Sequence, residues 1–160
     1  MTNKDYSITV IIPTFNEVNN VEKVITKVRE VLKKEDFQIL FVDDSSNDGT
    51  IEEIKKFKKE FSNIDLILRI GRRGLSGACI EGIQNSKSSF IAIMDCDLQH
   101  DEKLLLKMLN EFKYNNQLDL VIGSRHVEEG DSQKGLSYLR NLGSLYAIKL
   151  TQKLLKIKIK

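Results

Sequence analysis

Short runs of β-branched and other apolar residues alternate along the chain with longer segments of helical period. The apolar runs predict strands at Ile8–Ile12, Gln38–Val42, Leu66–Ile70, Phe90–Met94 and Leu120–Ile122. After the first run, apolar residues recur at offsets 0, 3, 4, 7, 10 and 11 from Val21, which predicts one apolar stripe on a helix. Strands that alternate with helices indicate βαβ units and an α/β fold with one mainly parallel sheet.

Two further helices follow from similar patterns. Thr50-Ile-Glu-Glu53 has the form of a capping box and predicts a helix that starts there. Apolar residues at positions 105, 108, 109 and 112 predict another helix between the last two runs. Residues 124–135 lack an apolar period and predict a loop. We therefore expect one domain over residues 1–137, followed by a different segment.

The segment at 138–160 combines apolar residues with lysines at 149, 153, 156, 158 and 160. One interpretation is a basic amphipathic helix that lies on an anionic membrane surface, with its lysines turned outward. An equally weighted interpretation is a core helix without its packing partner. The last five residues, Lys-Ile-Lys-Ile-Lys, could also pair as a strand.

Composition excludes several classes of protein. With 160 residues, 41% of them hydrophobic, the chain is long enough for one domain with a sizeable core. A net charge of +2 is too small to make nucleic acid an expected partner. Cys79 and Cys96 lack disulfide or zinc-site spacing, which fits a reducing cytosol. No apolar run is long enough to span a bilayer.

Polar clusters follow four of the predicted strands, at residues 13–17, 43–50, 95–100 and 123–125. In parallel sheets, ligands bind beyond the carboxyl ends of the strands, so these clusters are the first candidates for a site. Helix capping alone could account for part of this polarity, because Asp and Ser favour the starts of helices. For Asp48 and Thr50 we expect helix capping.

Asp95 and Asp97 follow a strand two residues apart, and this spacing directs both carboxylates to the same side. Two such charges about 6 Å apart at an effective dielectric constant near 20 repel by roughly 3 kcal/mol, and a divalent cation would remove this penalty. Oxygen ligands from Asp97, Gln99 and Asp95 suit Mg²⁺ or Mn²⁺. The spacing alone is common by chance, but its position directly after an apolar run favours a site.

Five motifs occur in order along the chain: Pro-Thr-Phe-Asn-Glu at 13–17, Val-Asp-Asp-Ser-Ser-Asn-Asp-Gly-Thr at 42–50, Gly-Leu-Ser-Gly-Ala at 74–78, Asp-Cys-Asp-Leu-Gln-His at 95–100 and Gly-Ser-Arg at 123–125. Together they resemble family 2 glycosyltransferases of the dolichyl-phosphate mannosyltransferase type and are similar to undecaprenyl-phosphate glycosyltransferases. The resemblance implies a GT-A fold and a nucleoside-diphosphate sugar donor, GDP-mannose or UDP-glucose. It also implies a divalent metal and a polyprenyl phosphate acceptor, with the protein peripheral on the cytosolic face of a membrane.

The resemblance implies that Pro13, Phe15 and Glu17 line the nucleotide pocket, with Val42 and Asp44 beside the base and ribose. Taken singly, two of these residues could instead serve the fold. Phe15 could belong to the core, and Glu17 could be a carboxylate favoured by a helix dipole. Their expected position at one crevice favours binding.

The resemblance also implies contacts to the donor phosphates. Asp95 and Cys96 would touch the donor, while Asp97 and Gln99, with Asp95, would hold Mg²⁺ or Mn²⁺ across the diphosphate. The glycine-containing stretch at 71–78 could cradle a phosphate at a helix start. Close packing of a helix on a strand would require the same glycines equally well.

The acceptor determines the expected mechanism. A lipid phosphate has a second pKa near 6 by analogy with phosphorylated side chains, so it can attack the anomeric carbon without an enzymic base. The resemblance implies that Arg125 and Arg140 meet the acceptor phosphate, with Asp97 and Arg125 as the catalytic residues. Inversion at the anomeric carbon follows, and catalysis would lie in positioning and in stabilisation of the leaving nucleoside diphosphate.

Departures from the family pattern leave alternatives open. Relatives continue past position 160, so the C-terminal part looks truncated. One alternative is a catalytically incomplete fragment that binds nucleotide sugar or membrane without transfer. Another is a nucleotidyltransferase, which also uses paired aspartates and Mg²⁺. For that class we expect a glycine-rich loop after the first strand, where this chain has Pro-Thr-Phe-Asn-Glu.

Overall fold

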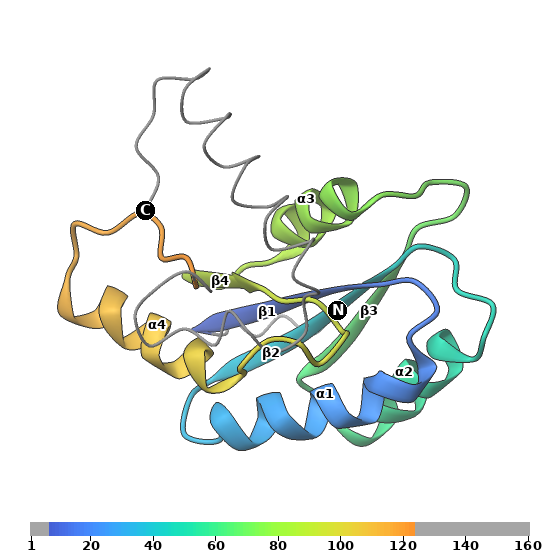
Figure 1. Ribbon diagram of the computed structural model, residues 1–160, viewed down its shortest axis with the longest axis horizontal. Helices are drawn as coiled ribbons and strands as arrows, with labels where there is room; N and C mark the ends of the chain where they lie inside the picture. Colours follow the sequence, from blue (N-terminus) through green and yellow to red (C-terminus); the bar gives the residue numbers. More distant parts are fainter. Residues whose placement is uncertain (1–6, 124–160) are drawn as a thin grey trace, which may run out of the picture. The chain divides into compact units, whose positions relative to one another are not determined.

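Strands and helices alternate over residues 7–123, the part of the chain that the computed structural model describes (Figure 1). The strands are β1 (Ile8–Thr14), β2 (Phe37–Asp43), β3 (Ile64–Leu68) and β4 (Phe90–Ile93). A helix follows each of them: α1 (Val18–Val31), α2 (Thr50–Glu60), α3 (Leu75–Asn85) and α4 (Lys103–Tyr114). Of the described residues, those up to Asp119 belong to one compact unit, and residues 120–123 belong to another.

The four strands form one sheet in the order β3-β2-β1-β4, and every pairing is parallel. Along β1, Ile8 pairs with Phe37 and with Phe90, and Thr14 pairs with Asp43. Asp43 in turn pairs with Leu68. The predicted parallel α/β arrangement is therefore confirmed, and the loops after β1, β2 and β3 leave the sheet at one level.

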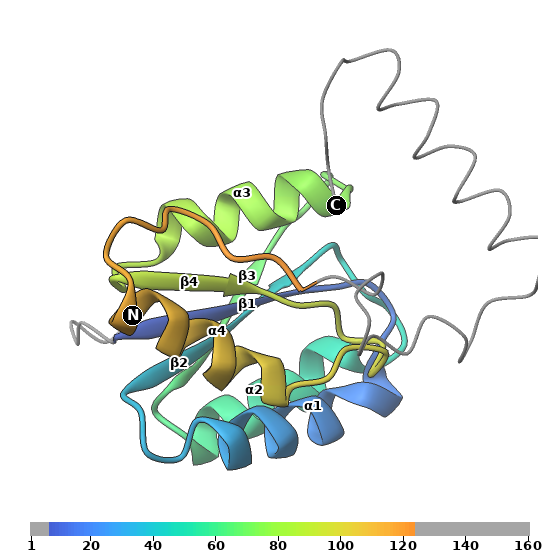
Figure 2. The same ribbon diagram turned by 60° about the vertical axis from the view of Figure 1, so that its left-hand side comes forward.

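Helices cover both faces of the sheet. Figures 1 and 2 show α1, α2 and α4 on one face and α3 on the other. Alternate residues of the central strand serve the two layers, because successive side chains of a strand point to opposite faces. Val10 and Ile12 pack in the larger core with residues of α1, α2 and α4, whereas Ile11 packs with Ala78 of α3.

The apolar stripe predicted after the first strand is confirmed in α1, where Val21, Val24, Ile25 and Val28 are buried. The capping box predicted at Thr50 is wrong in detail. The helix begins there, but Thr50 is already helical, and its N–H and hydroxyl both donate to Asp48 Oδ1, over 3.0 and 2.5 Å. Asp48 therefore satisfies one free N–H at the start of α2, in agreement with its expected capping role.

Two predicted strands differ from the structure. The third lies at Ile64–Leu68, two residues earlier than expected, because Ile64 pairs with Ile39 while Ile70 turns outward and is 82% exposed. The run at Leu120–Ile122 is not a strand. An apolar run becomes a strand only when a neighbour pairs with its backbone, and within residues 7–123 no sheet pairing includes these residues.

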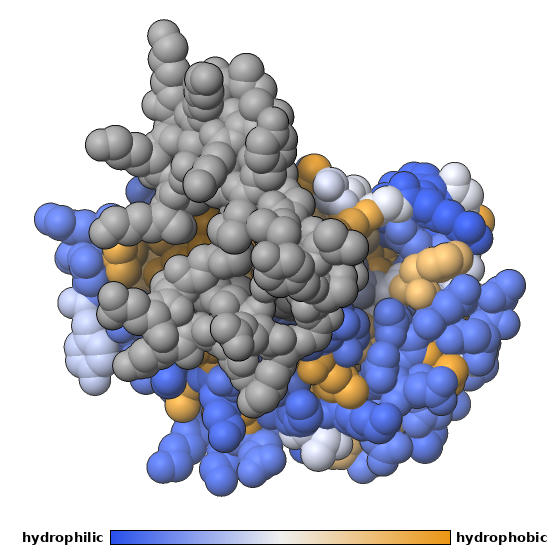
Figure 3. Space-filling model, in the orientation of Figure 1, coloured by the Kyte–Doolittle hydropathy of each residue, from blue (hydrophilic) through white to orange (hydrophobic). Residues whose placement is uncertain are grey.

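Exposed apolar side chains interrupt a mainly polar surface (Figure 3). α3 packs against β1 and β2, while Ile91 and Ile93 of β4 are 39% and 50% exposed. Ile80 and Ile83 on α3 are exposed as well. No helix within the described part of the chain has the length and apolar character needed to cross a bilayer.

Close packing of α3 on the sheet depends on Gly82. A Cβ atom at this position would lie 2.6 Å from Ile11 Cγ2 and 3.2 Å from Val42 Cγ2. Such contacts force buried side chains of the smaller core to move. Glycine at position 82 is therefore required by the packing of the helix on the strands.

Gly82→Ala tests this packing because two effects have opposite signs. Helix propensity alone favours alanine by about 1 kcal/mol, but overpacking against Ile11 costs about 1–3 kcal/mol or more. We expect the free energy of unfolding in urea to fall for Gly82→Ala and to change by less than about 0.5 kcal/mol for the exposed control Gln84→Ala. A more stable Gly82→Ala protein would contradict the close packing.

Candidate functional site

Three loops at the carboxyl-terminal edge of the sheet each hold one residue in the left-handed backbone region. These residues are Asn16 after β1, Ser45 after β2 and Leu98 after β4, with φ of 59°, 62° and 60°. Within residues 7–123 they are the non-glycine residues with positive φ. Leucine seldom adopts this conformation, and such residues often mark functional sites. Tertiary contacts must therefore hold these loops in shape.

Reciprocal hydrogen bonds join the first two loops. The N–H of Asn16 donates to Ser46 Oγ over 2.8 Å, and the N–H of Asn47 donates to Asn16 Oδ1 over 3.1 Å. Asp48 extends the connection, because its Oδ2 accepts from the N–H of Val18 at the start of α1. The loops after β1 and β2 therefore form one hydrogen-bonded unit at this edge.

Asp43, at the end of β2, lies fully buried beneath that unit. Its carboxylate accepts hydrogen bonds from the Thr14 hydroxyl over 2.8 Å and from the N–H and hydroxyl of Ser46 over 2.8 and 2.7 Å. These donors satisfy a buried charge that would otherwise be costly. Asp43 therefore supports the loops from below, a role that its place in an Asp-Asp pair did not reveal.

Asp44 is also buried, and it forms an ion pair with Arg69 through Oδ1. Its Oδ2 accepts the N–H of Gly74 over 2.6 Å. The sequence motifs indicated a nucleotide-pocket role for Asp44 but gave no role to Arg69, which directly follows β3 and is 5% exposed. An arginine inside the apolar run at 66–70 was the available signal, because a buried cation needs a partner.

The remaining residues of the expected nucleotide pocket differ in exposure. Phe15 is 44% exposed, and the guanidinium of Arg73 lies 4.5 Å from its ring centroid. Glu17 is half-buried and accepts from Asn20 Nδ2 over 2.7 Å. Pro13 is half-buried in β1, whereas Val42 is fully buried in the core beneath α3.

The side chains of the segment after β4 differ in burial, and Cys96, expected to touch the donor, lies in the core. Cys96 is 2% exposed and packs in the larger core, while Asp97 is exposed and the Asp95 side chain is 49% exposed. Asp97 Oδ1 accepts the N–H of Gln99 over 3.0 Å, which fixes the turn. His100 Nε2 lies 3.4 Å from Asp95 Oδ2. The buried cysteine anchors the segment, and the flanking carboxylates face outward.

This donor set fits a hard divalent cation only in part. Asp95, Asp97 and Gln99 offer carboxylate and amide oxygens, which Mg²⁺ and Mn²⁺ prefer. Among the described residues, no group of three or more His, Cys, Asp or Glu side chains could hold a metal alone. A cation held here therefore needs oxygens from a ligand or water, as Mg²⁺ sites at phosphates commonly do.

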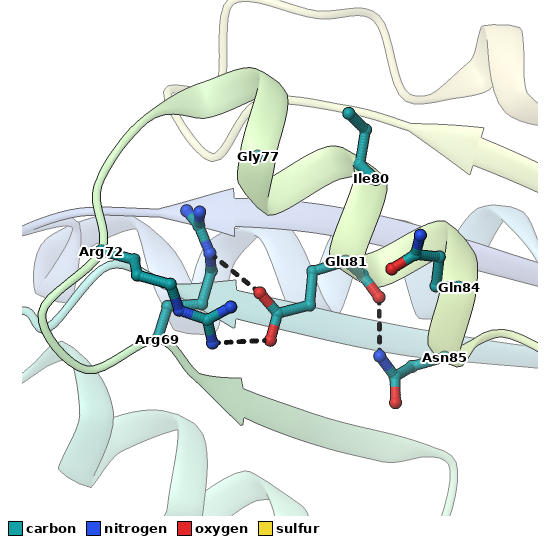
Figure 4. Close-up of a pocket in the computed structure, with 7 residues that line it drawn as sticks. All are labelled: Arg69, Arg72, Gly77, Ile80, Glu81, Gln84 and Asn85. Atoms are coloured by element: carbon teal, nitrogen blue, oxygen red, sulfur yellow. Dashed lines mark hydrogen bonds and ion pairs between the residues drawn. The ribbon is translucent and has the colours of Figure 1, made fainter.

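A polar groove lies beside α3 (Figure 4). Its lining residues are Arg69, Arg72, Gly77, Ile80, Glu81, Gln84 and Asn85. Glu81 bridges two arginines there, accepting from Arg69 Nε and from Arg72 Nη2, both over 3.1 Å. The guanidinium of Arg69 thus reaches from this groove to Asp44 at the edge of the sheet.

Four predicted features lie outside the described residues. They are Arg125, Arg140, the loop at 124–135 and the basic segment at 138–160. The structure therefore brings together the expected residues after β1, β2 and β4, while the expected acceptor residues stay predictions.

Burial and nearby carboxylates control the chemistry of Cys96. Burial raises the pKa of this thiol from 9.0 to about 12, and the negative charges of Glu17, Asp97 and Asp95 act in the same direction. Burial also raises the pKa of Cys79, which is half-buried on α3. Cys96 is therefore a neutral thiol at neutral pH and acts as an apolar anchor.

Comparison with known proteins gives the family context of this arrangement. The model of the family described as "Glycosyl transferase family 2" matches residues 9–159. A dolichol-phosphate mannosyltransferase of Pyrococcus furiosus is 34% identical over 77% of this chain and 34% of its own length. The Saccharomyces cerevisiae protein of the same name is 33% identical over 74% of this chain and 44% of its own length. The putative glycosyltransferase CsbB of Bacillus subtilis is 30% identical over 96% of this chain and 45% of its own length.

Solved structures show the same fold at lower identity. The mannosyltransferase PcManGT from Pyrobaculum calidifontis, in complex with GDP-Man and Mn²⁺, has a TM-score of 0.56 at 21% identity, over 69% of this chain and 33% of that chain. Glucosyl-3-phosphoglycerate synthase from Mycobacterium tuberculosis has a TM-score of 0.53 at 19% identity, over 68% of this chain and 39% of that one. The expected GT-A fold is confirmed. The chain spans less than half the length of the three relatives and two structures described.

Thiol reactivity tests the placement of Cys96. At pH 8 a thiol of pKa about 12 is ionised in about one molecule in ten thousand, and the thiolate is the reactive form. We expect Cys79→Ala, which retains Cys96, to react with Ellman's reagent at least about tenfold more slowly than Cys96→Ala, which retains Cys79. Both should react fully in urea. Fast reaction of Cys96 in the folded protein would contradict its burial.

The raised pKa of Cys96 makes the free energy of unfolding depend on pH in the alkaline range. The unfolded thiol ionises near its ordinary pKa of 9.0 and the folded one only near 12, so the unfolded state binds fewer protons between these values. The contribution of Cys96 to stability is complete below pH 9 and is lost as the pH rises towards 12. Between pH 9 and pH 12, the free energy of unfolding in urea should fall less for Cys96→Ala than for the wild type.

Proposed function

The chain belongs to glycosyl transferase family 2, and we propose that it transfers a hexose from a nucleoside-diphosphate sugar to a polyprenyl phosphate. Mannose from GDP-mannose is the first candidate, since relatives at 30–34% identity are named dolichol-phosphate mannosyltransferases. Glucose from UDP-glucose is the second. The observation that carries this proposal is the gathering of three shaped loops and the Asp95–Asp97 pair at the carboxyl edge of one parallel sheet.

The nucleoside would bind between the loops after β1 and β2. Phe15 offers an exposed ring, and Glu17 and Asp44 offer carboxylates at the same edge. Pro13 would line the pocket next to them. Since the Val42 side chain is buried beneath α3, its contact with the nucleoside would come from the backbone.

The donor phosphates would lie at the segment after β4. Asp97 and Gln99, with Asp95, would hold Mg²⁺ or Mn²⁺, which when bound would neutralise charge on the departing diphosphate. The Asp97 carboxylate is held in place through Oδ1, which accepts the N–H of Gln99. Cys96 is buried, so any contact that it makes with the donor would use its backbone.

The acceptor would approach as an anionic phosphate. Arg125 and Arg140 would bind this phosphate, since guanidinium groups suit phosphate oxygens. Its oxygen would attack the anomeric carbon from the side opposite the leaving diphosphate, which inverts the configuration there. Residues 138–160 would place this step at the cytosolic face of a membrane by lying on its anionic surface.

A second candidate function is donor binding without transfer. It is favoured by the hydrogen-bonded unit of the loops after β1 and β2, because the residues expected to bind the donor lie at this edge of the sheet. In this alternative the loops after β1, β2 and β4 would bind the nucleotide sugar with metal, and no hexose would be transferred.

A transfer assay tests the proposal with purified chain, Mn²⁺, radiolabelled GDP-mannose or UDP-glucose, and polyprenyl phosphate in detergent. We expect label in the lipid phase, its loss with EDTA and recovery with added Mn²⁺. Asp97→Ala should lower the rate at least about a hundredfold. The matched control Asp119→Ala, which removes an exposed carboxylate, should change the rate less than about twofold.

The outcomes separate the two candidate functions. Absence of label, together with calorimetric binding of GDP that requires Mn²⁺, would support donor binding without transfer. Absence of both label and metal-dependent nucleotide binding would contradict both. Transfer that persists in Asp97→Ala would contradict the assigned metal site.

A further inference from the structure

Arg69 is a buried arginine whose guanidinium contacts three separate segments of the chain. Its side chain is 6% exposed, and its guanidinium donates to Asp44 Oδ1, to Glu81 Oε2 over 3.1 Å and to the carbonyl oxygen of Gly74 over 3.1 Å. These acceptors come from three segments: the loop after β2, the helix α3 and the turn before α3. Arg69 therefore joins the edge of the sheet to the helix that covers one of its faces.

The backbone of Arg69 is tied to the same loop as its side chain. Its N–H donates to the carbonyl oxygen of Asp43 over 2.9 Å, and its carbonyl oxygen accepts the hydroxyl of Ser45 over 2.8 Å. Ser45 is the left-handed residue of the loop after β2. The main chain of Arg69 thus hydrogen-bonds to the residues before and after Asp44, and its side chain pairs with Asp44 itself.

Asp44 has both carboxylate oxygens occupied by this arrangement. Oδ1 accepts from Arg69, and Oδ2 accepts the N–H of Gly74 over 2.6 Å. The terminal torsion of an aspartate is otherwise broad, so two donors in fixed positions determine its orientation. One lone pair on each oxygen is left for a ligand, since a carboxylate has about four acceptor positions.

Gly77 and Glu81 on α3 fix Arg69 in turn. A Cβ atom at Gly77 would lie 2.5 Å from Arg69 Nη2, so glycine leaves the space that the guanidinium fills. Glu81 accepts from Arg69 and also from Arg72, which is exposed (Figure 4). Arg69 and Arg72 thus share Glu81, but only Arg69 also pairs with Asp44 among the contacts of the described residues.

We propose that Arg69, supported by Glu81, is a positioning residue that orients Asp44 for recognition of the donor nucleoside. This inference rests on the proposed function, in which Asp44 lies beside the base and ribose. Arg69 does not itself touch the donor; it acts by fixing the direction of the Asp44 oxygens. Loss of Arg69 should therefore weaken nucleoside binding and leave binding of the diphosphate group with Mn²⁺ at Asp97 unchanged.

Calorimetric titration of the full chain tests this with two probes, GDP with Mn²⁺ and inorganic pyrophosphate with Mn²⁺. For Arg69→Gln we expect the Kd of GDP to rise about tenfold and that of pyrophosphate to change less than about twofold. The control Lys87→Gln removes an equal charge at an exposed position outside the site, and it should leave both Kd values within about twofold. Urea unfolding of each variant reports whether it is folded.

A double-mutant cycle distinguishes positioning from a purely structural role. If Arg69 acts through Asp44, Arg69→Gln should weaken GDP binding less than about twofold further in an Asp44→Asn background. The proposal would be overturned if the double variant raised the Kd of GDP by the product of the two single-variant factors. It would also be overturned if Arg69→Gln raised the Kd of GDP and of pyrophosphate equally. A folded Arg69→Gln protein with wild-type GDP affinity would also overturn it.

A second variant, Glu81→Gln, keeps the proposal testable. If Arg69→Gln does not fold, Glu81→Gln provides the test, because it loosens Arg69 but leaves its pair with Asp44 intact. It should raise the Kd of GDP about threefold and leave that of pyrophosphate within about twofold, and an unchanged Kd of GDP would overturn the proposal. Failure of the wild type to bind either GDP or UDP with Mn²⁺ overturns the proposed function and this inference together. Normal wild-type binding with unaffected variants overturns this inference alone.

Discussion

Parallel pairing of β1 with both β2 and β4 is the constraint on which the candidate site depends. Parallel strands must all end at the same edge of a sheet, so the loops that follow them are neighbours even though they lie far apart in the sequence. Burial fixes this arrangement, because β1 is covered by helices on both faces and nearly all its side chains are buried. The parallel sheet thus determines the position of the site, and the polar residues of the loops determine its chemistry.

Buried carboxylates then turn a set of adjacent loops into a defined surface. Asp43 satisfies its charge with donors from two loops, and Asp44 with Arg69 and the turn before α3. Breaking a buried ion pair by removing one partner costs about 3–5 kcal/mol, so the pair of Asp44 and Arg69 resists rearrangement. Beyond this framework, Asp95 and Asp97 hold exposed carboxylates in a segment that the buried Cys96 anchors. A site for a charged substrate needs both features: buried groups that keep the loops rigid and exposed carboxylates that can bind a ligand.

The fold could be predicted from the sequence because periodicity reports burial directly, as the stripe of α1 and the strands β1, β2 and β4 confirm. Features that depend on distant partners could not be predicted in the same way. Arg69 lies inside an apolar run of the sequence, and its burial is explained only by its distant partners Asp44 and Glu81. The local start of α2, by contrast, was predicted in part, because Asp48 accepts the N–H of Thr50 as expected, while Thr50 is itself the first helical residue. The positive φ of Leu98 reflects the geometry of its loop and has no signal in residue type. At Leu120–Ile122 local propensity indicated a strand, but a strand also requires a paired neighbour.

Paramagnetic broadening by Mn²⁺ would test the central claim most directly, that this edge of the sheet binds the metal and the nucleotide together. Amide spectra of the isotope-labelled chain would be recorded with GDP alone and then with substoichiometric Mn²⁺. The account predicts that the amides of residues 95–100 broaden first, that those of the loops after β1 and β2 shift with GDP, and that Asp97→Ala removes the broadening but not the fold. Broadening centred on another acidic surface, or GDP shifts confined to residues away from this edge, would contradict the account.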